Sequence, residues 1–245
     1  MYIVGITGAI DHGKTTFGQA LQKLEPKSVH YESAEVIAAL AQMWLAMAPE
    51  LPNAQDIPAI NQWLQQLVPV LNRDFGVNCT FLQIKITNDE VAQRPDNYQK
   101  LFDFLAQPKA DFSTITEANK TYFRPLLQWM GGYFVAKLDF GIWYKQILLR
   151  IQKDQAAGID LATVGGLRYP EDAAILKSAG ATIVGINRPG HAEADIDDPT
   201  ERERQSIPVD TTIINNGTLE QLEACAAHFY NDLQHNQLQV TYQAA

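Results

Sequence analysis

Residues 8–15 read Gly8-Ala-Ile-Asp-His-Gly-Lys14-Thr15 and match the phosphate-loop pattern G-x-x-x-x-G-K-[ST] at every fixed position. The preceding segment, 2–7 (YIVGIT), is short, β-branched and apolar, as in a buried parallel strand. The following segment, 15–24, carries apolar side chains at helical spacing. A strand, a glycine-rich loop and a helix in this order predict a site for a nucleoside triphosphate.

Each fixed residue of the loop has a chemical role. Backbone N–H groups surround the phosphates, and the helix N-terminus adds partial positive charge. We expect Lys14 to bridge the outer phosphates and the Thr15 hydroxyl to ligate Mg²⁺. The predicted nucleotide-binding residues are Gly8, Asp11, His12, Gly13, Lys14, Thr15 and Thr16.

Composition narrows the class of protein. The chain has 245 residues and a net charge of −9, which argues against broad nucleic-acid binding and favours a small-molecule nucleotide substrate. The two cysteines show no metal-ligand spacing, so we expect buried thiols in a reducing compartment. No apolar run approaches the length of a membrane span. These features predict a cytoplasmic protein without a membrane partner, and they are compatible with a homodimer.

Further strand-like runs predict an α/β fold. They lie at 29–31, 161–164, 181–186 and 211–214, each followed by a helical pattern or a polar loop. With the first strand they give a five-stranded, mainly parallel sheet, as in a P-loop NTPase three-layer sandwich. Thr218 can cap a last helix over 219–233, and we expect the tail after Leu233 to be loose.

The long gap between the second and third strands reads mostly as helices. Their predicted ranges are 34–47, 57–71, 98–106, 123–138 and 140–151. Segment 80–87 fits either a strand or a helical joint. We therefore expect a single domain over 1–245 that carries a large helical insertion at 34–153.

The loop also looks like that of translational GTPases, through the string DHGKTT at 11–16. A GTPase needs an Asp three residues before the glycine of its switch motif. The nearest similar sequence, Pro189-Gly190-His191, has Asn187 at that position. A GTPase also needs a guanine-reading N-K-x-D motif, but Asn119-Lys120 continues with Thr-Tyr. The GTPase interpretation fails both requirements.

The rest of the chain resembles phage-type deoxynucleoside monophosphate kinases, within a wider group that includes dephospho-CoA kinase. Residues 124–131 resemble the family's R-x-x-L-Q-x-x-G helix, and 139–143 its D-x-x-x-W segment. Residues 164–171 are similar to its V-x-D-V-R-F-P-N-E turn, and 210–219 to its final strand and helix start. The resemblance implies Mg²⁺-dependent transfer of the γ-phosphoryl group of ATP to a (deoxy)nucleoside monophosphate, with the insertion binding the acceptor.

A kinase of this kind needs guanidinium groups for the acceptor phosphate, because Arg binds phosphate oxygens as a bidentate fork. Arg168 follows a strand and precedes a helix, at the edge of the sheet where α/β folds bind ligands. The alternative is a surface arginine that pairs with Glu171 or Asp172. Arg124 is the second candidate.

Gln128 lies one helical turn after Arg124, so the two share a face that suits a phosphate and a base or sugar. The alternative is equally plausible on the sequence: Arg124 caps a helix contact, and Gln128 is a buried polar spacer. We assign the nearby aromatic residues Trp129, Trp143 and Tyr144 to the core rather than to the site.

Glu35 follows the second strand, where the resemblance implies a carboxylate that orients the acceptor or assists proton removal. The helix dipole alone would favour a glutamate in this first turn, and Glu32 competes with it equally. Asp11 is the other carboxylate near the transferred phosphate.

Residues 188–208 resemble a lid that closes over the triphosphate and supplies cations. Its candidates are Arg188, Arg202 and Arg204, although alternating charges are also typical of a solvated loop. The predicted catalytic set is Lys14, Glu35, Arg168 and Arg188.

Two positions depart from the family. Gly165-Gly166 stands where the family carries a strand-end Asp that helps hold Mg²⁺. Either Glu171 or Asp172 substitutes for it, or the metal relies on Thr15 and water. His12 occupies a loop position that a small residue usually fills. These departures leave open a weak kinase, a shifted substrate, or a protein that binds nucleotide without efficient turnover. The alternative functions are a dephospho-CoA kinase-like enzyme and a nucleotide-binding switch or regulatory module, and the missing strand-end Asp is the main support for the switch.

Overall fold

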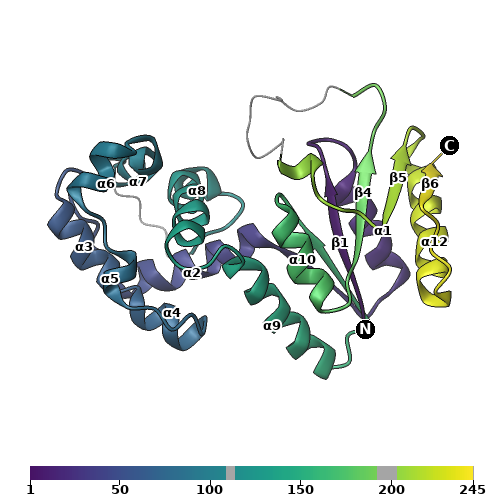
Figure 1. The fold of residues 1–245 in the computed structure, drawn as a ribbon, viewed down its shortest axis with the longest axis horizontal. Coiled ribbons are helices and arrows are strands. Elements are labelled where there is room, and N and C mark those ends of the chain that lie inside the picture. The colour runs from purple at the N-terminus through teal and green to yellow at the C-terminus, as the bar shows by residue number, and fades with distance from the viewer. Residues whose placement is uncertain (109–113, 192–202, 245) are drawn as a thin grey trace. The chain divides into compact units, whose positions relative to one another are not determined.

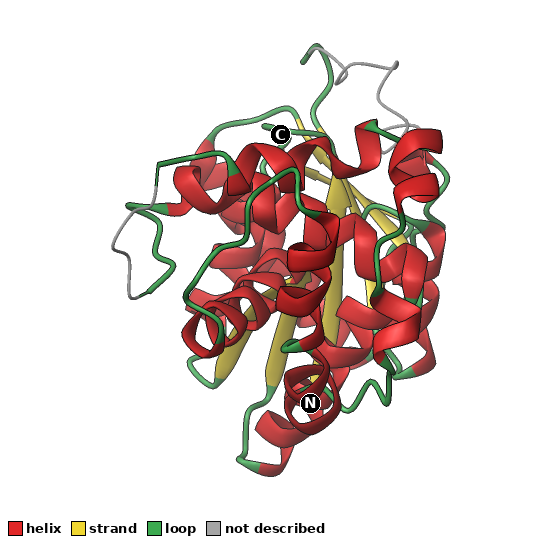
Figure 2. Cartoon of the chain, turned by 90° about the vertical axis from the view of Figure 1, so that its left-hand side faces the viewer, coloured by secondary structure: helices red, strands yellow, loops and turns green. Residues whose placement is uncertain are grey.

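The computed structural model describes residues 1–108, 114–191 and 203–244. Its strands form one parallel sheet. Its strands are β1 (Tyr2–Gly8), β2 (Ser28–Glu32), β3 (Leu161–Gly165), β4 (Thr182–Asn187), β5 (Thr211–Asn215) and β6 (Thr241–Ala244). They pair in the order β2-β3-β1-β4-β5-β6, and every pair is parallel. Figure 1 labels β1, β4, β5 and β6 side by side, and Figure 2 shows the strands of the sheet in yellow. The sequence therefore predicted the α/β class and parallel sheet correctly, with one strand too few.

The chain forms two compact units. The first comprises Met1–Ser33 and Ile147–Ala245, and the second comprises Ala34–Gln146. The chain leaves the first unit at the start of α2 (Ser33–Met47) and returns to it within α9 (Ile142–Ala156).

Helices cover both faces of the sheet in the first unit. On one face, Val4 and Ile6 of β1 pack in a core with α1 (Lys14–Leu24) and α12 (Leu219–His235). Within this core the rings of Phe17 and Phe229 lie 5.6 Å apart. On the other face, α10 (Pro170–Ser178) places Leu176 beside β1. Alternate residues of β1 thus face opposite helical layers, which gives the predicted three-layer arrangement.

The C-terminal segment corrects the prediction of a loose tail. Residues Thr241–Ala244 form β6 and pair in register with β5 from Thr212 onward. The Tyr242 hydroxyl donates a hydrogen bond to Asp232 Oδ2 at 3.0 Å. Only Tyr242 and Ala244 of this strand are buried. Two inward-facing positions give too short an apolar pattern to predict a strand, so pairing with β5 decides the structure.

Helices make up the regular structure of the described part of the second unit. Besides α2 and the start of α9, they are α3 (Ile57–Gln65), α4 (Val68–Asp74), α5 (Phe81–Ile84), α6 (Asn88–Gln93), α7 (Asp96–Leu105) and α8 (Lys120–Lys137). The predicted helix 57–71 is divided into α3 and α4. The stacked rings of Trp44 and Trp63, 3.7 Å apart, form part of the buried core.

The ambiguous segment 80–87 is a helical joint. It contains α5 and a short extended stretch that leads to α6. The side-chain amide of Asn61 pairs with both backbone groups of Ile86, each at 2.8 Å. A side chain therefore satisfies the backbone that a neighbouring strand would otherwise pair with.

The predicted core residues are buried. Trp129, Trp143 and Tyr144 lie inside the second unit, and both cysteine thiols are buried and free. Within the described ranges, no helix is both long and apolar enough to span a membrane.

Candidate functional site

The phosphate loop connects β1 to α1, and close approaches explain its two fixed glycines. A Cβ on Gly8 would lie 2.5 Å from the carbonyl oxygen of Ile186 in β4. Gly13 has a φ of +99°, and a Cβ there would lie 2.6 Å from Asn215 Nδ2. A side chain at either position would push the loop away from the ends of β4 and β5.

The loop presents positive charge at the start of α1. Gly13 is the N-cap residue and provides no side-chain cap, so the first N–H groups of α1 are not satisfied by the cap. Lys14 Nζ donates a hydrogen bond to the carbonyl oxygen of Ala9 at 2.6 Å, which holds the ammonium group against the loop. The exposed Thr15 hydroxyl follows directly. This arrangement suits an anion such as a polyphosphate.

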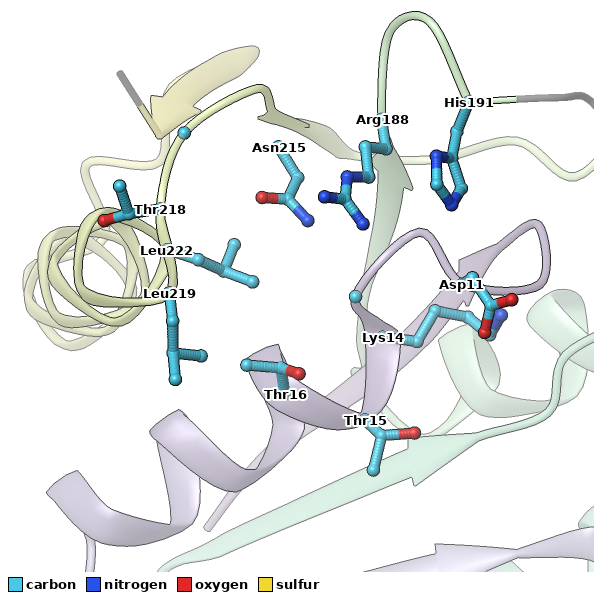
Figure 3. A pocket seen from close by; sticks show the side chains of 12 residues that line it. Asp11, Lys14, Thr15, Thr16, Arg188, His191, Asn215, Thr218, Leu219 and Leu222 are labelled. Atoms are coloured by element: carbon cyan, nitrogen blue, oxygen red, sulfur yellow. The ribbon is translucent and has the colours of Figure 1, made fainter.

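A cavity of about 580 Å³ lies beside the loop, within the size range of small-molecule sites. Three segments of the first unit line it: the loop with the start of α1, the residues after β4, and the end of β5 with the start of α12. The lining residues are Asp11, Gly13, Lys14, Thr15, Thr16, Arg188, His191, Asn215, Gly217, Thr218, Leu219 and Leu222. In Figure 3 the Arg188 guanidinium and the Asn215 amide point toward one another above Lys14.

One buried and one partly buried polar contact hold the loop in place. Asn215 Nδ2 donates to the carbonyl oxygen of His12 at 2.9 Å, and the backbone N–H of Arg188 donates to His12 Nδ1 at 3.2 Å. Burial lowers the pKa of His12, and the nearby charges of Arg204 and Lys14 lower it further. His12 is therefore neutral at pH 7 and keeps a nitrogen that can accept.

Sequence comparison assigns the family independently of the loop. Residues 59–225 match the family described as deoxynucleotide monophosphate kinase, over more than half of the chain. The chain belongs to this kinase family. A search of curated proteins found no match. The matched span begins after β1 and α1, so the phosphate loop is a separate observation in agreement with a nucleotide monophosphate kinase.

The structure brings several of the residues predicted for this kinase site together. Asp11, Gly13, Lys14, Thr15, Thr16 and Arg188 line the cavity. Gly8 and His12 support the loop from behind it. Arg204 is half-buried, and its effect on the pKa of His12 places its charge near the loop. Arg202 lies outside the described residues, as does much of the predicted lid 188–208.

Sequence reasoning gave no site role to six lining residues: His191, Asn215, Gly217, Thr218, Leu219 and Leu222. The similarity of 210–219 to the kinase family already marked most of this segment. Asn215 also ends β5, and ligands bind at the carboxyl ends of parallel strands. Applying that rule to every strand end would have identified Asn215.

Arg168 lies where the sequence predicted, after β3 and before α10, with an exposed side chain. Asp172 Oδ2 accepts the backbone N–H groups of Arg168 and Tyr169, at 3.0 and 3.1 Å. Across residues 1–108, 114–191 and 203–244, no ion pair joins the Arg168 guanidinium to Glu171 or Asp172. Burial raises the pKa of Asp172 to about 6, against the two backbone hydrogen bonds that lower it.

The other predicted acceptor residues of the kinase lie in the second unit. Glu35 is in the first turn of α2, and Arg124 and Gln128 are on α8. All three side chains are exposed, so Gln128 is not a buried polar spacer. Their role in acceptor binding stays a prediction.

Proposed function

We propose that this protein transfers the γ-phosphoryl group of ATP to a deoxynucleoside monophosphate. The observation that carries the proposal is the phosphate loop, with Lys14 and Arg188 on the same cavity as the uncapped N-terminus of α1. Family membership supplies the reaction class. The donor and the acceptor are proposed from the loop chemistry and from the resemblance described above.

The described residues suit the donor. The N–H groups of the loop would bind the phosphates, while Lys14 and Arg188 offset the charge that develops on the transferred group. Leu219 and Leu222 form an apolar part of the cavity wall, which suits the flat face of a base (Figure 3). Phosphoryl transfer depends mainly on positioning and charge, and the cavity offers both.

Thr15 is the proposed magnesium ligand in the loop. Its exposed hydroxyl lines the cavity, and a hydroxyl oxygen is a hard donor of the kind that Mg²⁺ binds. When bound, the ion would neutralise phosphate charge and help orient the oxygens of the donor.

We assign acceptor binding to exposed groups that suit a phosphomonoester and a nucleoside. Arg168 and Arg124 provide bidentate donors for phosphate, and Gln128 provides an amide for a base or sugar. Glu35 would orient the acceptor.

The test is ADP production from ATP and Mg²⁺ with a panel of deoxynucleoside and ribonucleoside monophosphates and dephospho-CoA. We expect turnover with a deoxynucleoside monophosphate and at least a 100-fold loss in Lys14→Ala, since the lysine acts on the transferred phosphate. Lys23→Ala is the matched control, because Lys23 lies on the same helix and pairs with the surface residue Glu223.

Each outcome of this assay identifies one function. Turnover with dephospho-CoA alone would indicate the related kinase group. Tight ATP binding without acceptor-dependent turnover would contradict a kinase and favour a nucleotide-binding switch. Full activity in Lys14→Ala would refute the assigned site.

A further inference from the structure

The carboxylate of Glu32 occupies the space beside the glycine pair that ends β3. Glu32 and Gly165 are register partners in the parallel pair β2–β3. A Cβ on Gly165 would lie 2.7 Å from Glu32 Cδ, and a Cβ on Gly166 would lie 2.6 Å from Glu32 Oε2. The chain thus places a carboxylate from the neighbouring strand where side chains at 165 and 166 would begin.

This carboxylate lies at the edge of the sheet that carries the phosphate loop. β3 is the direct neighbour of β1, and β2 is the next strand out. The Thr7 hydroxyl, one residue before the loop glycine Gly8, donates to the carbonyl oxygen of Leu167 at 3.3 Å. The residue after Gly166 therefore contacts the residue that precedes the loop.

The sequence lacks the carboxylate expected at this point. In the pattern V-x-D-V-R-F-P-N-E, the aspartate falls at Gly166. Asp172, one of the two substitutes expected from the sequence, is buried, and its Oδ2 already accepts two backbone N–H groups at the start of α10. Glu32 is the carboxylate that directly contacts the position of the missing side chain.

Neighbouring polar groups orient Glu32 and leave it open to solvent. His30 Nε2 lies 3.2 Å from Glu32 Oε1, while His30 Nδ1 lies 2.8 Å from the Thr163 hydroxyl. The Glu32 side chain is 37% exposed, so water and hydrated ions can reach it. Mg²⁺ commonly binds one or two protein oxygen ligands together with phosphate oxygens and waters.

We propose that Glu32 supplies from β2 the carboxylate that the family pattern places at the end of β3, and that it holds the nucleotide-bound Mg²⁺ or its coordinated waters. The proposal rests on the proposed nucleotide site. In this chain the end of β3 carries no side chain where the family pattern has a carboxylate, and the adjacent strand β2 fills that space with the same chemical group.

The test measures metal dependence separately from turnover. Binding of a non-hydrolysable ATP analogue is titrated against Mg²⁺ for the wild type, Glu32→Gln and the surface control Glu50→Gln. We expect Glu32→Gln to need about 10-fold more Mg²⁺ for half-maximal enhancement of binding, because outer ligands typically contribute 10- to 100-fold to metal affinity. Binding in EDTA should be unchanged. An unaltered Mg²⁺ requirement in Glu32→Gln overturns the proposal.

A second pair of variants tests the exchange itself. Gly166→Asp alone should impair Mg²⁺-dependent binding, because its side chain would meet Glu32 Oε2. The double variant Glu32→Ala/Gly166→Asp removes that conflict, and its Mg²⁺ requirement should lie within about 3-fold of the wild type. Residue 166 has a φ of +72°, which Asp tolerates better than most residues. A folded double variant that binds like Glu32→Ala would show that the two positions are not equivalent. Failure of the wild type to bind the analogue even with Mg²⁺ would instead refute the nucleotide site.

Discussion

The backbone N–H of Arg188 donates a hydrogen bond to His12 Nδ1, which joins the segment that leaves β4 to the phosphate loop. Because a backbone N–H can only donate, we assign His12 as the tautomer protonated at Nε2. Nδ1 also lies 3.4 Å from the carbonyl oxygen of Ile186. Protonation of the ring would favour donation to Ile186 and break the contact with Arg188.

Two substitutions of His12 should separate the effect of losing this hydrogen bond from the effect of losing the volume of the imidazole. His12→Ala leaves the partly buried N–H of Arg188 without its partner, which costs up to about 1.5 kcal/mol, and should weaken ATP binding by up to about 10-fold. His12→Asn keeps an acceptor near Nδ1 and should bind ATP within about 3-fold of the wild type. Calorimetric titration with ATP measures both. Equal losses in the two variants would show that the imidazole is needed for its volume alone.

The same contact predicts a pH dependence of donor binding. The pKa of His12 is lowered from 6.5, so the folded protein binds its proton less readily than the unfolded chain. Stability from this group is present above about pH 6.5 and is lost as the pH falls toward the lowered pKa. The Arg204, Lys14 and His191 charges that face the ring act in the same direction. The ATP affinity of the wild type should therefore fall more steeply below about pH 6 than the ATP affinity of His12→Asn. Protonation of ATP affects both proteins equally, so the difference between them reports on His12.

Arg188 should act mainly on the chemical step. Its guanidinium points into the cavity toward the Asn215 amide, and Lys14 lines the same cavity (Figure 3). We expect Arg188→Ala to lower kcat about 100-fold with a smaller effect on the KM for ATP, and Arg188→Lys to recover part of the loss. Steady-state kinetics measure this, with Arg73→Ala as the surface control. A rise in KM with unchanged kcat would assign Arg188 to ground-state binding.

The raised pKa of Asp172 should make the free energy of unfolding depend on pH within a defined range. Its pKa is raised to about 6, so the folded protein holds this proton more tightly than the unfolded chain, and the group lowers stability as the pH rises from about 4 to 6. In Asp172→Asn one oxygen can still accept from Arg168 and Tyr169 without carrying a buried charge. Relative to the wild type, the variant should gain about 2 kcal/mol of unfolding free energy between about pH 4.5 and pH 7.5. Urea unfolding at the two pH values measures the change, and a constant difference would contradict the raised pKa.

Two adjacent glycines of α8 should respond differently to alanine. A Cβ on Gly132 meets nothing within 4 Å, so Gly132→Ala should stabilise the protein by about 0.5–1 kcal/mol through helix propensity. At Gly131 a Cβ would lie 3.4 Å from Ile37 Cδ1, and Trp143 Nε1 donates to the Gly131 carbonyl oxygen. Gly131→Ala should gain less or lose stability. Thermal unfolding compares the pair, and equal gains would show that the packing against Ile37 has no cost.

The sequence predicted much of the fold because its signals are local. Apolar runs identified five of the strands, and Thr218 was expected to cap the last helix, as its hydrogen bond from the Gln221 N–H confirms. The break between α3 and α4 was missed because both helices continue one apolar pattern. The fixed residues of the phosphate loop were predicted from spacing alone, and the structure gives the reasons for its glycines.

By itself the sequence determined that this protein has a parallel α/β core, a phosphate loop and a kinase-like order of segments, since each depends on residues close together in the chain. Only the tertiary structure decided that Asn215 braces the loop, that β6 completes the sheet, and that Glu32 fills the space beside the Gly165-Gly166 pair. These relationships join residues from 29 to 203 positions apart. They follow from which strands become neighbours, because pairing brings together side chains that no local pattern connects.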